Sequence, residues 1–211
     1  MRSPFVVVAM VTAALPPLLH AQEVPHPDAG TVFVFSQGRV ERFVRGEGNM
    51  QVWATLRGRE YRRHSNPATP ILEWQVGDRS GTRRLVGNVD AVWPPRTGSK
   101  TRFRVLSETI DGNDRRRSVQ LWRCEVLAMA PIATPAGRFE TIPLRCLRYS
   151  ANTMRPLQTR TWYWSPAVGH YVRRVTENMR SGETQAIDLC ASLPAHRATD
   201  ARIRAIVASD C

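Results

Sequence analysis

Apolar and polar residues alternate in short runs along most of this chain. The run Met50–Leu56 is typical, and glycine-containing turns such as Gln37-Gly38 and Gly46–Asn49 separate neighbouring runs. Because successive side chains of a β-strand point to opposite faces, this pattern predicts half-buried strands. The expected strands are residues 31–36, 39–44, 50–56, 59–63, 71–76, 82–86, 102–106, 118–127, 139–149, 162–165, 170–175 and 184–189.

Short turns between consecutive strands favour an antiparallel meander, and a sheet with this many strands tends to curl or close. We therefore expect an all-β fold with a short C-terminal helix, in which the meander forms a strongly curved sheet or a partly open barrel. The helix is expected after Thr199, which can cap it, because Ile203, Ile206 and Val207 have helical spacing.

The first residues of the chain have the pattern of a secretory signal peptide. Arg2 precedes an apolar run from Phe5 to Leu19, and Ala21 is a suitable small residue before a cleavage site. No second apolar stretch approaches spanning length, so we expect a periplasmic protein that is not transmembrane after signal removal. The expected organisation is a signal peptide at 1–21, a flexible leader at 22–30, a single curved antiparallel β domain at 31–190 and a tail with a short helix at 191–211.

An exported chain with an even number of cysteines is expected to form disulfides. The four cysteines allow three pairings, of which we favour Cys124–Cys146 and Cys190–Cys211, because each closes a local loop. In an antiparallel pair centred near Pro135, Cys124 lies opposite Cys146, within disulfide reach. The close Cys-x-x-Cys pairs typical of zinc sites are missing, and the histidines are scattered, so no metal site is predicted.

The net charge of +12 comes almost entirely from arginine, since Lys100 is the only lysine. A basic chain attracts nucleic acid, anionic lipid or acidic glycans. Export separates the protein from most nucleic acid, so a nucleic-acid partner is not expected. We assign most arginines to solvated, outward strand positions. The Arg115–Arg117 loop tip is an alternative contact for an anionic lipid or glycan.

Residues 118–175 carry a recognisable series of motifs. A strand with Trp122 and Cys124 leads to a Pro-Ala-Gly-x-Phe turn, a strand with Cys146, and a Trp-Tyr-x-x-Pro-x-Val-Gly hairpin. This series resembles a pattern in exported bacterial β-domain proteins of unknown function. It is also similar in outline to the lipoprotein-carrier fold of the Lol pathway. The structural motif consists of Pro135, Gly137, Phe139, Trp162, Tyr163, Pro166 and Gly169.

The resemblance to lipoprotein carriers implies a concave sheet that can shield an acyl chain. Six tryptophans suit either core filling or an aromatic-lined concavity. The candidate ligand-facing residues are Trp122, Trp162 and Trp164. The expected ligand is therefore a lipid or an anionic component of the cell envelope, and no cofactor is expected.

Catalytic motifs are not evident in the sequence. Ser165, His170 and Asp188 are close in sequence, but no Gly-x-Ser-x-Gly elbow accompanies them, and no phosphate-cradling Gly-x-x-x-x-Gly-Lys is present. We therefore predict an exported, non-catalytic β protein that binds an amphiphilic or anionic ligand. The alternatives are a structural or assembly factor that acts through protein contacts and, with less support, a hydrolase.

Overall fold

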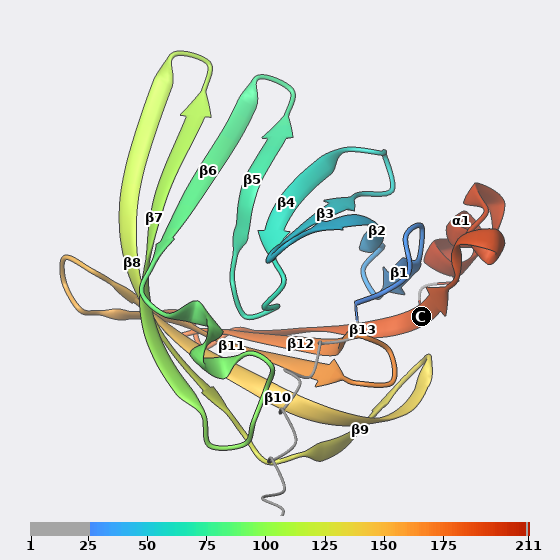
Figure 1. The fold of residues 1–211 in the computed structure, drawn as a ribbon. Helices are drawn as coiled ribbons and strands as arrows, with labels where there is room; N and C mark the ends of the chain where they lie inside the picture. Colours follow the sequence, from blue (N-terminus) through green and yellow to red (C-terminus); the bar gives the residue numbers. More distant parts are fainter. Residues whose placement is uncertain (1–25, 210) are drawn as a thin grey trace, which may run out of the picture.

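The computed structural model describes residues 26–209 and 211, which form a strand-rich molecule with a short helix at its C-terminal end (Figure 1). The strands are β1 (Val32–Phe35), β2 (Val40–Glu47), β3 (Met50–Ala54), β4 (Glu60–His64), β5 (Ile71–Val76), β6 (Arg79–Val86), β7 (Lys100–Asp111), β8 (Asp114–Val126), β9 (Ala130–Thr134), β10 (Gly137–Ser150), β11 (Pro156–Ser165), β12 (His170–Asn178) and β13 (Thr184–Leu193). The helices are the 3-10 turns η1 (Val89–Val92) and η2 (Ala195–Arg197) and the α-helix α1 (Asp200–Ala208).

Every strand pairing in the described chain is antiparallel, and the sheet closes on itself. The order runs from β11 through β12, β13 and β1 to β8 and β10, and β10 then pairs with β11. Only β9 lies outside this ring, paired with β10 alone. The expected all-β meander with a C-terminal helix is confirmed, and its sheet is a closed barrel. The β5–β6 and β7–β8 hairpins project beyond the rest of the barrel (Figure 1).

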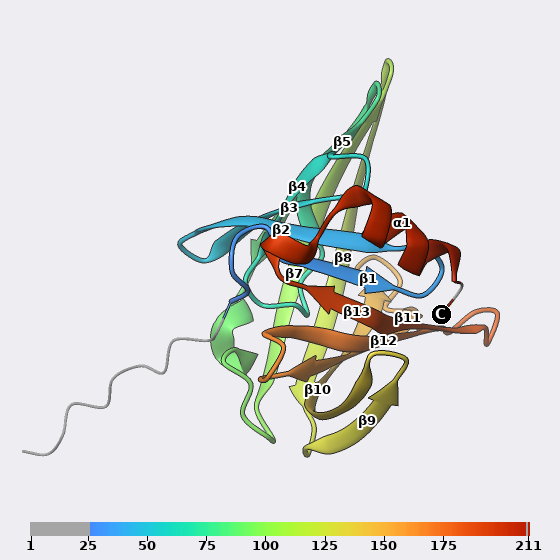
Figure 2. The same cartoon turned by 90° about the vertical axis from the view of Figure 1, so that its right-hand side faces the viewer.

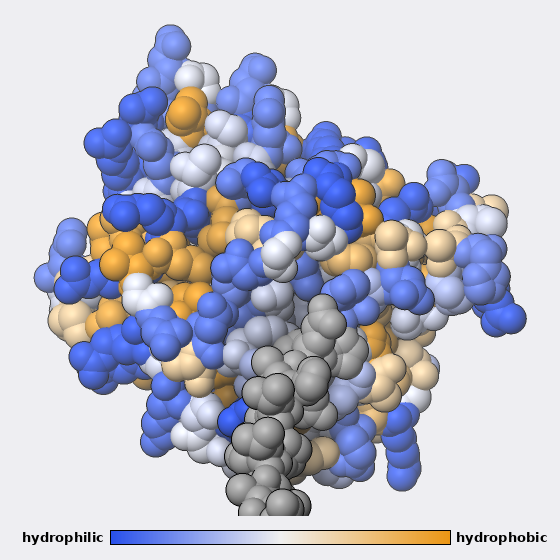
Figure 3. Space-filling model, in the orientation of Figure 1, coloured by the Kyte–Doolittle hydropathy of each residue, from blue (hydrophilic) through white to orange (hydrophobic). Residues whose placement is uncertain are grey.

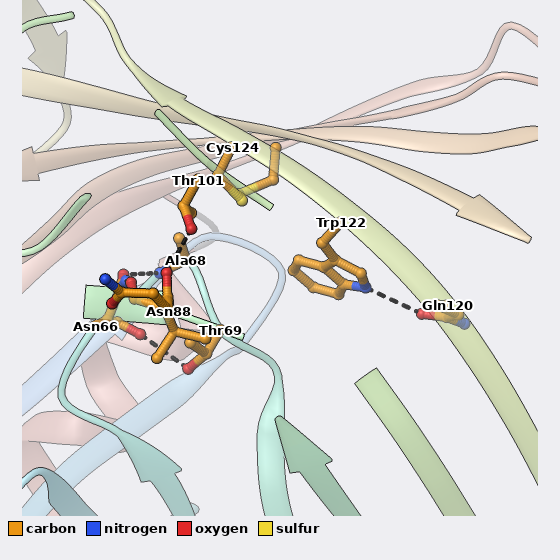
Figure 4. The surroundings of a disulfide bond; sticks show 10 residues. Asn66, Ala68, Thr69, Asn88, Thr101, Gln120, Trp122 and Cys124 are labelled. Carbon is orange, nitrogen blue, oxygen red and sulfur yellow. Dashed lines mark hydrogen bonds between the residues drawn. A yellow bond between two sulfur atoms is a disulfide. The ribbon is translucent and has the colours of Figure 1, made fainter. Parts of the chain in front are cut away.

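One end of the barrel, called the closed end below, is filled by chain that folds inward. The β4–β5 loop buries Asn66 and Ala68 completely, and Val92 of η1 is equally buried beside them. The Asn66 side chain donates to the carbonyl of Val89 at 2.8 Å and accepts from the amide of Ala68 at 3.0 Å, which ties the loop to η1. Figure 4 shows this loop near Trp122 and the disulfide of Cys124.

The two disulfides join Cys124 to Cys146 and Cys190 to Cys211. Cys124 and Cys146 are direct cross-strand partners on β8 and β10, with Cα atoms 4.0 Å apart. The second disulfide ties β13 to the end of the chain beyond α1. This helix begins after the capping residue Thr199 and packs Ile203 on the outer side of β1 (Figure 2).

The structure differs from the sequence interpretation at β9, which is not among the expected strands and contains Pro131. Proline lacks a ladder donor, but β9 has a partner on one side only, so one edge needs no donors. The predicted signal peptide at 1–21 and the first part of the leader, 22–25, lie outside the described residues. In the described part, Gly30 donates to the carbonyl of Phe43 at 2.8 Å, and Pro27 is buried.

Candidate binding site in the barrel interior

The interior of the barrel is apolar in its middle and changes character toward the end opposite the closed one, called the open end below. The apolar part contains Trp53, Phe103, Trp122 and Trp162, each at most 3% exposed. It continues to the closed end through the loop around Ala68. This core is built from the inward-facing residues of neighbouring strands, as alternation requires.

One pleat nearer the open end, the inward positions of several strands are occupied by arginine. Each lies two positions from a buried residue of the same strand. Arg148 follows Cys146 on β10, Arg160 precedes Trp162 on β11, and Arg174 follows Val172 on β12. Cross-strand pairs share a face of the sheet, and the pairs Cys146–Arg160 and Trp162–Arg174 therefore place these guanidinium groups inside. We call the half-buried residues Arg39, Arg83, Arg148, Arg160 and Arg174 the arginine layer.

Aromatic rings and neutral polar groups support part of the arginine layer. The Arg148 guanidinium lies 5.2 Å from the centroid of Trp122, and that of Arg160 lies 5.6 Å from Trp162, so both stack on the apolar core. The side-chain amide oxygen of Gln158 accepts hydrogen bonds from both arginines, and that of Gln120 accepts a further one from Arg148. These partners satisfy some N–H groups and neutralise no charge.

Carboxylates are scarce around these guanidinium groups. Within residues 26–209 and 211, none forms an ion pair with Arg83, Arg148, Arg160 or Arg174. The buried Nε atoms of the last three also have no hydrogen-bond acceptor among these residues. The arginine layer therefore concentrates positive charge in a partly desolvated space.

The pKa values of the arginines report the same excess of positive charge. Burial, and then the charges of neighbouring arginines, lowers the pKa of Arg160 to about 9, so it is still protonated at neutral pH. Burial and the charge of Arg83 lower the pKa of Arg148. Burial likewise lowers the pKa of Arg174, and Arg39 adds to this effect. These mutual effects indicate that the arginine layer surrounds one common space.

Glu41 is a fully buried acidic residue of the interior, and its carboxylate is paired with side chains of the protein itself. It is 1% exposed, and its carboxylate lies 2.6 Å from Arg39, 3.4 Å from Arg63 and 3.0 Å from His170. The Tyr171 hydroxyl donates to it at 2.6 Å. Although burial opposes ionisation, these partners hold the pKa of Glu41 well below its usual range.

A cavity of about 680 Å³ leads from the arginine layer toward the open end. Its wall combines the charged Arg39 and Arg83 with the apolar Ile71 and Trp74. Trp74 lies directly opposite Gly81 in the β5–β6 pair, and a Cβ atom at Gly81 would lie 2.6 Å from Cζ2 of this indole. The missing side chain of Gly81 therefore gives the ring of Trp74 its place in the cavity wall.

The three tryptophans predicted to face a ligand all lie in the interior. Trp122 and Trp162 are 1% and 3% exposed and form the surface on which Arg148 and Arg160 stack. Trp164 is near the closed end, where it contacts Trp93 edge-to-face and lines a separate cavity of about 310 Å³.

Trp162 belongs both to the sequence motif and to the surface under the arginine layer, whereas the turn residues of the motif lie away from that layer. Pro135 occupies the turn between β9 and β10, and Gly137 follows it with a φ of 134°. Phe139 packs against the core from β10, while Pro166 and Gly169 belong to the β11–β12 turn at the closed end. The motif thus describes turns and packing of the fold.

The residues of the conceivable hydrolase triad are not arranged as one. Ser165 and His170 are cross-strand neighbours, but the buried Ser165 hydroxyl has no hydrogen-bond partner in the described chain. His170 uses one ring nitrogen toward Glu41 and the other toward Arg63, and Asp188 pairs with Arg173. Among residues 26–209 and 211, no cluster of three or more histidine, cysteine or acidic side chains could hold a metal ion.

The arginine layer differs from our assignment of arginines to outward positions. The available signal was the spacing itself, because Arg148, Arg160 and Arg174 each continue an inward run of Cys146, Trp162 and Val172 by two positions. In the part of the chain that the structure describes, no helix is long and apolar enough to cross a membrane.

Comparison with known proteins adds information about the fold. No protein-family model and no curated protein matches the chain. The hypothetical lipoprotein YmcC from Escherichia coli (K12) is similar in structure, with a TM-score of 0.50 and 10% identity over 78% of this chain and 84% of that chain. A Bacteroides fragilis NCTC 9343 protein with a YmcC-like fold gives a TM-score of 0.45 and 15% identity over 80% and 97%. At such identities, the likeness to the E. coli protein shows a shared fold.

Proposed function

We propose that this chain is an exported, non-catalytic protein whose barrel interior binds an anionic amphiphile. The observation that carries the proposal is the arginine layer, in which four guanidinium groups have no carboxylate partner within the described chain. Desolvated charges without counter-charges destabilise a fold, so their clustering is better explained by a ligand than by folding. A carboxylate or phosphate accepts paired hydrogen bonds from arginine and suits this layer.

The shape of the site favours a ligand with an apolar part as well. The cavity of about 680 Å³ carries Ile71, Trp74 and Val76 along the path from the open end to Arg83. An acyl or similar chain would lie along this wall while the acidic group contacts the arginine layer. This arrangement agrees with the acyl-chain shelter that the resemblance to lipoprotein carriers implies.

Export is part of the same proposal. The signal-like segment at 1–21 and the two disulfides both suit an oxidising compartment such as the periplasm. The E. coli protein that shares the fold is described as a lipoprotein, which fits a location at the cell envelope.

The binding proposal predicts preference for an acid over its neutral ester. Fluorescence titration with 11-(dansylamino)undecanoic acid should give saturable binding, and the methyl ester of the probe should bind at least about tenfold more weakly, because it lacks the charge that pairs with arginine. In the Arg160→Met and Arg174→Met variants, affinity for the acid should fall by a similar factor. Affinity for the ester should change little.

The matched control is Arg138→Met, an exposed arginine on β10 that faces Ala133 of β9. This variant removes the same charge from the molecule and should bind the acid like the wild type. Equal affinity for acid and ester, or unchanged affinity in both interior variants, would contradict an anion site. No saturable binding of the acid would favour the alternative, an assembly factor that acts through protein contacts.

A further inference from the structure

A second feature lies on the outer face of the barrel, on the opposite side of the sheet from the arginine layer. Here apolar side chains that would ordinarily be buried are open to solvent. Val86 of β6, Val119 of β8 and Met154 of the β10–β11 turn are 40%, 41% and 48% exposed. Figure 3 shows hydrophobic residues gathered on the side of the molecule where β7, β8 and the β10–β11 turn lie.

The strand register places these residues on one continuous surface. Val86 pairs with Arg104, which in turn pairs with Leu121, and Leu121 pairs with Tyr149 of β10. Direct cross-strand partners share a face of the sheet, so this row crosses four strands on the same side. We call the surface the outer patch; its apolar members are Val86, Leu106, Val119, Leu121, Leu147 and Met154.

Arginines alternate with the apolar residues across the outer patch. Arg84 pairs with Leu106, and Arg102 pairs with Arg123, which lies opposite Leu147. Within the described chain, none of these arginines, nor Arg104, forms an ion pair. A groove of about 510 Å³ runs between Val86, Leu121 and the β10–β11 turn.

The β10–β11 turn provides an independent sign that the exposure of Met154 has a function. Met154 has a φ of 53°, in the left-handed region where glycine and asparagine are favoured. A methionine in this conformation costs about 1 kcal/mol or more, and such residues are retained where the surrounding function needs them. Here the conformation lies at an exposed turn beside the outer patch.

We propose that the outer patch docks the protein on the surface of an anionic phospholipid bilayer. The mixture of exposed apolar and cationic residues fits a bilayer interface, where arginine stems lie along apolar surface while the guanidinium groups reach phosphate. Tyr149, with Arg123 stacked 5.2 Å from its ring, suits the same interfacial layer. Because none of the four arginines has a carboxylate partner in the described chain, the outer patch carries a net positive charge, which complements the phosphates of an anionic leaflet. The net charge of +12 adds long-range attraction.

The test is co-sedimentation of the full mature protein with vesicles of phosphatidylcholine, prepared with and without phosphatidylglycerol. Binding should require phosphatidylglycerol and weaken with added salt. The Arg104→Gln and Arg123→Gln variants should each bind about fivefold less, since an arginine near an anionic surface contributes about this factor. Met154→Asn should reduce binding by at least about tenfold through the lost apolar contact.

The Met154→Asn variant also separates docking from folding. Asparagine is better suited to the left-handed conformation, so this change should leave thermal stability equal or higher. The control is Met129→Asn, because Met129 is 57% exposed and lies after the C-terminal end of β8, outside the outer patch. Binding that is independent of phosphatidylglycerol, or that is equal in Met154→Asn and Met129→Asn, would overturn the proposal. So would a concentration-dependent oligomer of the wild type that Met154→Asn abolishes, because the patch would then be a self-association surface.

The interior variant Arg160→Met distinguishes this proposal from the binding function. It should sediment with vesicles like the wild type, while Met154→Asn should retain affinity for the dansylated acid. Loss of vesicle binding in Arg160→Met would assign membrane association to the interior and overturn docking by the outer patch.

Discussion

The charged residues inside this barrel fall into two groups with opposite energetic consequences. The carboxylate of Glu41 is surrounded by Arg39, Arg63 and His170, so its burial is compensated by ion pairs and hydrogen bonds. Arg160 and Arg174 are half-buried and face other arginines. The first group stabilises the fold as a unit, whereas the second opposes it, which is the pattern expected of a site kept for binding.

This distinction predicts that removing an interior arginine stabilises the protein. In Arg160→Met, the desolvation and mutual repulsion that lower its pKa to about 9 are lost, and methionine retains much of the contact with Trp162. Replacement of a poorly compensated buried charge by an apolar residue raises the free energy of unfolding by about 1–3 kcal/mol. The melting temperature should therefore rise by about 2–4 °C for each kcal/mol. A lower melting temperature than that of Arg138→Met in differential scanning calorimetry would show that Arg160 is structural.

At the scale of elements, the sequence pattern predicted the strands well because alternation is a direct property of extended chain. The runs around Val52, Trp122 and Trp162 are all strands in the structure. The same alternation does not tell which of two faces is the interior when a run ends in arginine. Only closure of the ring between β10 and β11 shows that Arg148 and Arg160 face the same space. The sequence therefore shows the spacing that places these arginines on one face with Cys146 and Trp162, but it does not show that this face encloses a common space.

The β5–β6 hairpin positions one wall of the cavity through a single glycine. Gly81→Ala should push the Trp74 indole out of place, at a cost of about 1–3 kcal/mol from overpacking. Urea unfolding measures this cost, and the dansylated acid should bind more weakly because Trp74 lines its cavity. In a Trp74→Leu background, the same change should cost clearly less, so the two substitutions should be strongly non-additive. Additive effects would place the strain of Gly81→Ala elsewhere in the hairpin.

For the whole molecule, the interior links folding to pH through a histidine that stays neutral. Burial lowers the pKa of His170 to about 4, against the hydrogen bond to Glu41. Its Nδ1 lies 3.4 Å from Arg63, which can only donate, so Nδ1 accepts and Nε2–H donates to Glu41. Protonation of His170 would therefore bring a further positive charge into an interior that already holds an excess of arginine.

The direction of the pH dependence follows from these pKa values. In the unfolded chain, histidine titrates near about pH 6.5, so between there and about pH 4 the unfolded state binds a proton that the folded state does not. The free energy of unfolding should then fall by up to about 3 kcal/mol across this range.

The depressed pKa of Glu41 stabilises the fold above about pH 4.3, and this contribution is lost as the pH falls further toward the pKa of Glu41 in the folded state. Both groups therefore act in the same direction, toward unfolding in acid. Urea denaturation at several pH values measures the slope. His170→Gln should reduce the part above about pH 4 and leave the loss below it; the rest above about pH 4 comes from His64, because burial lowers the pKa of this histidine too. A wild-type stability that is constant from about pH 7 to pH 4 would mean that His170 titrates normally, and the assignment of a neutral His170 beside the Glu41 carboxylate would then be wrong.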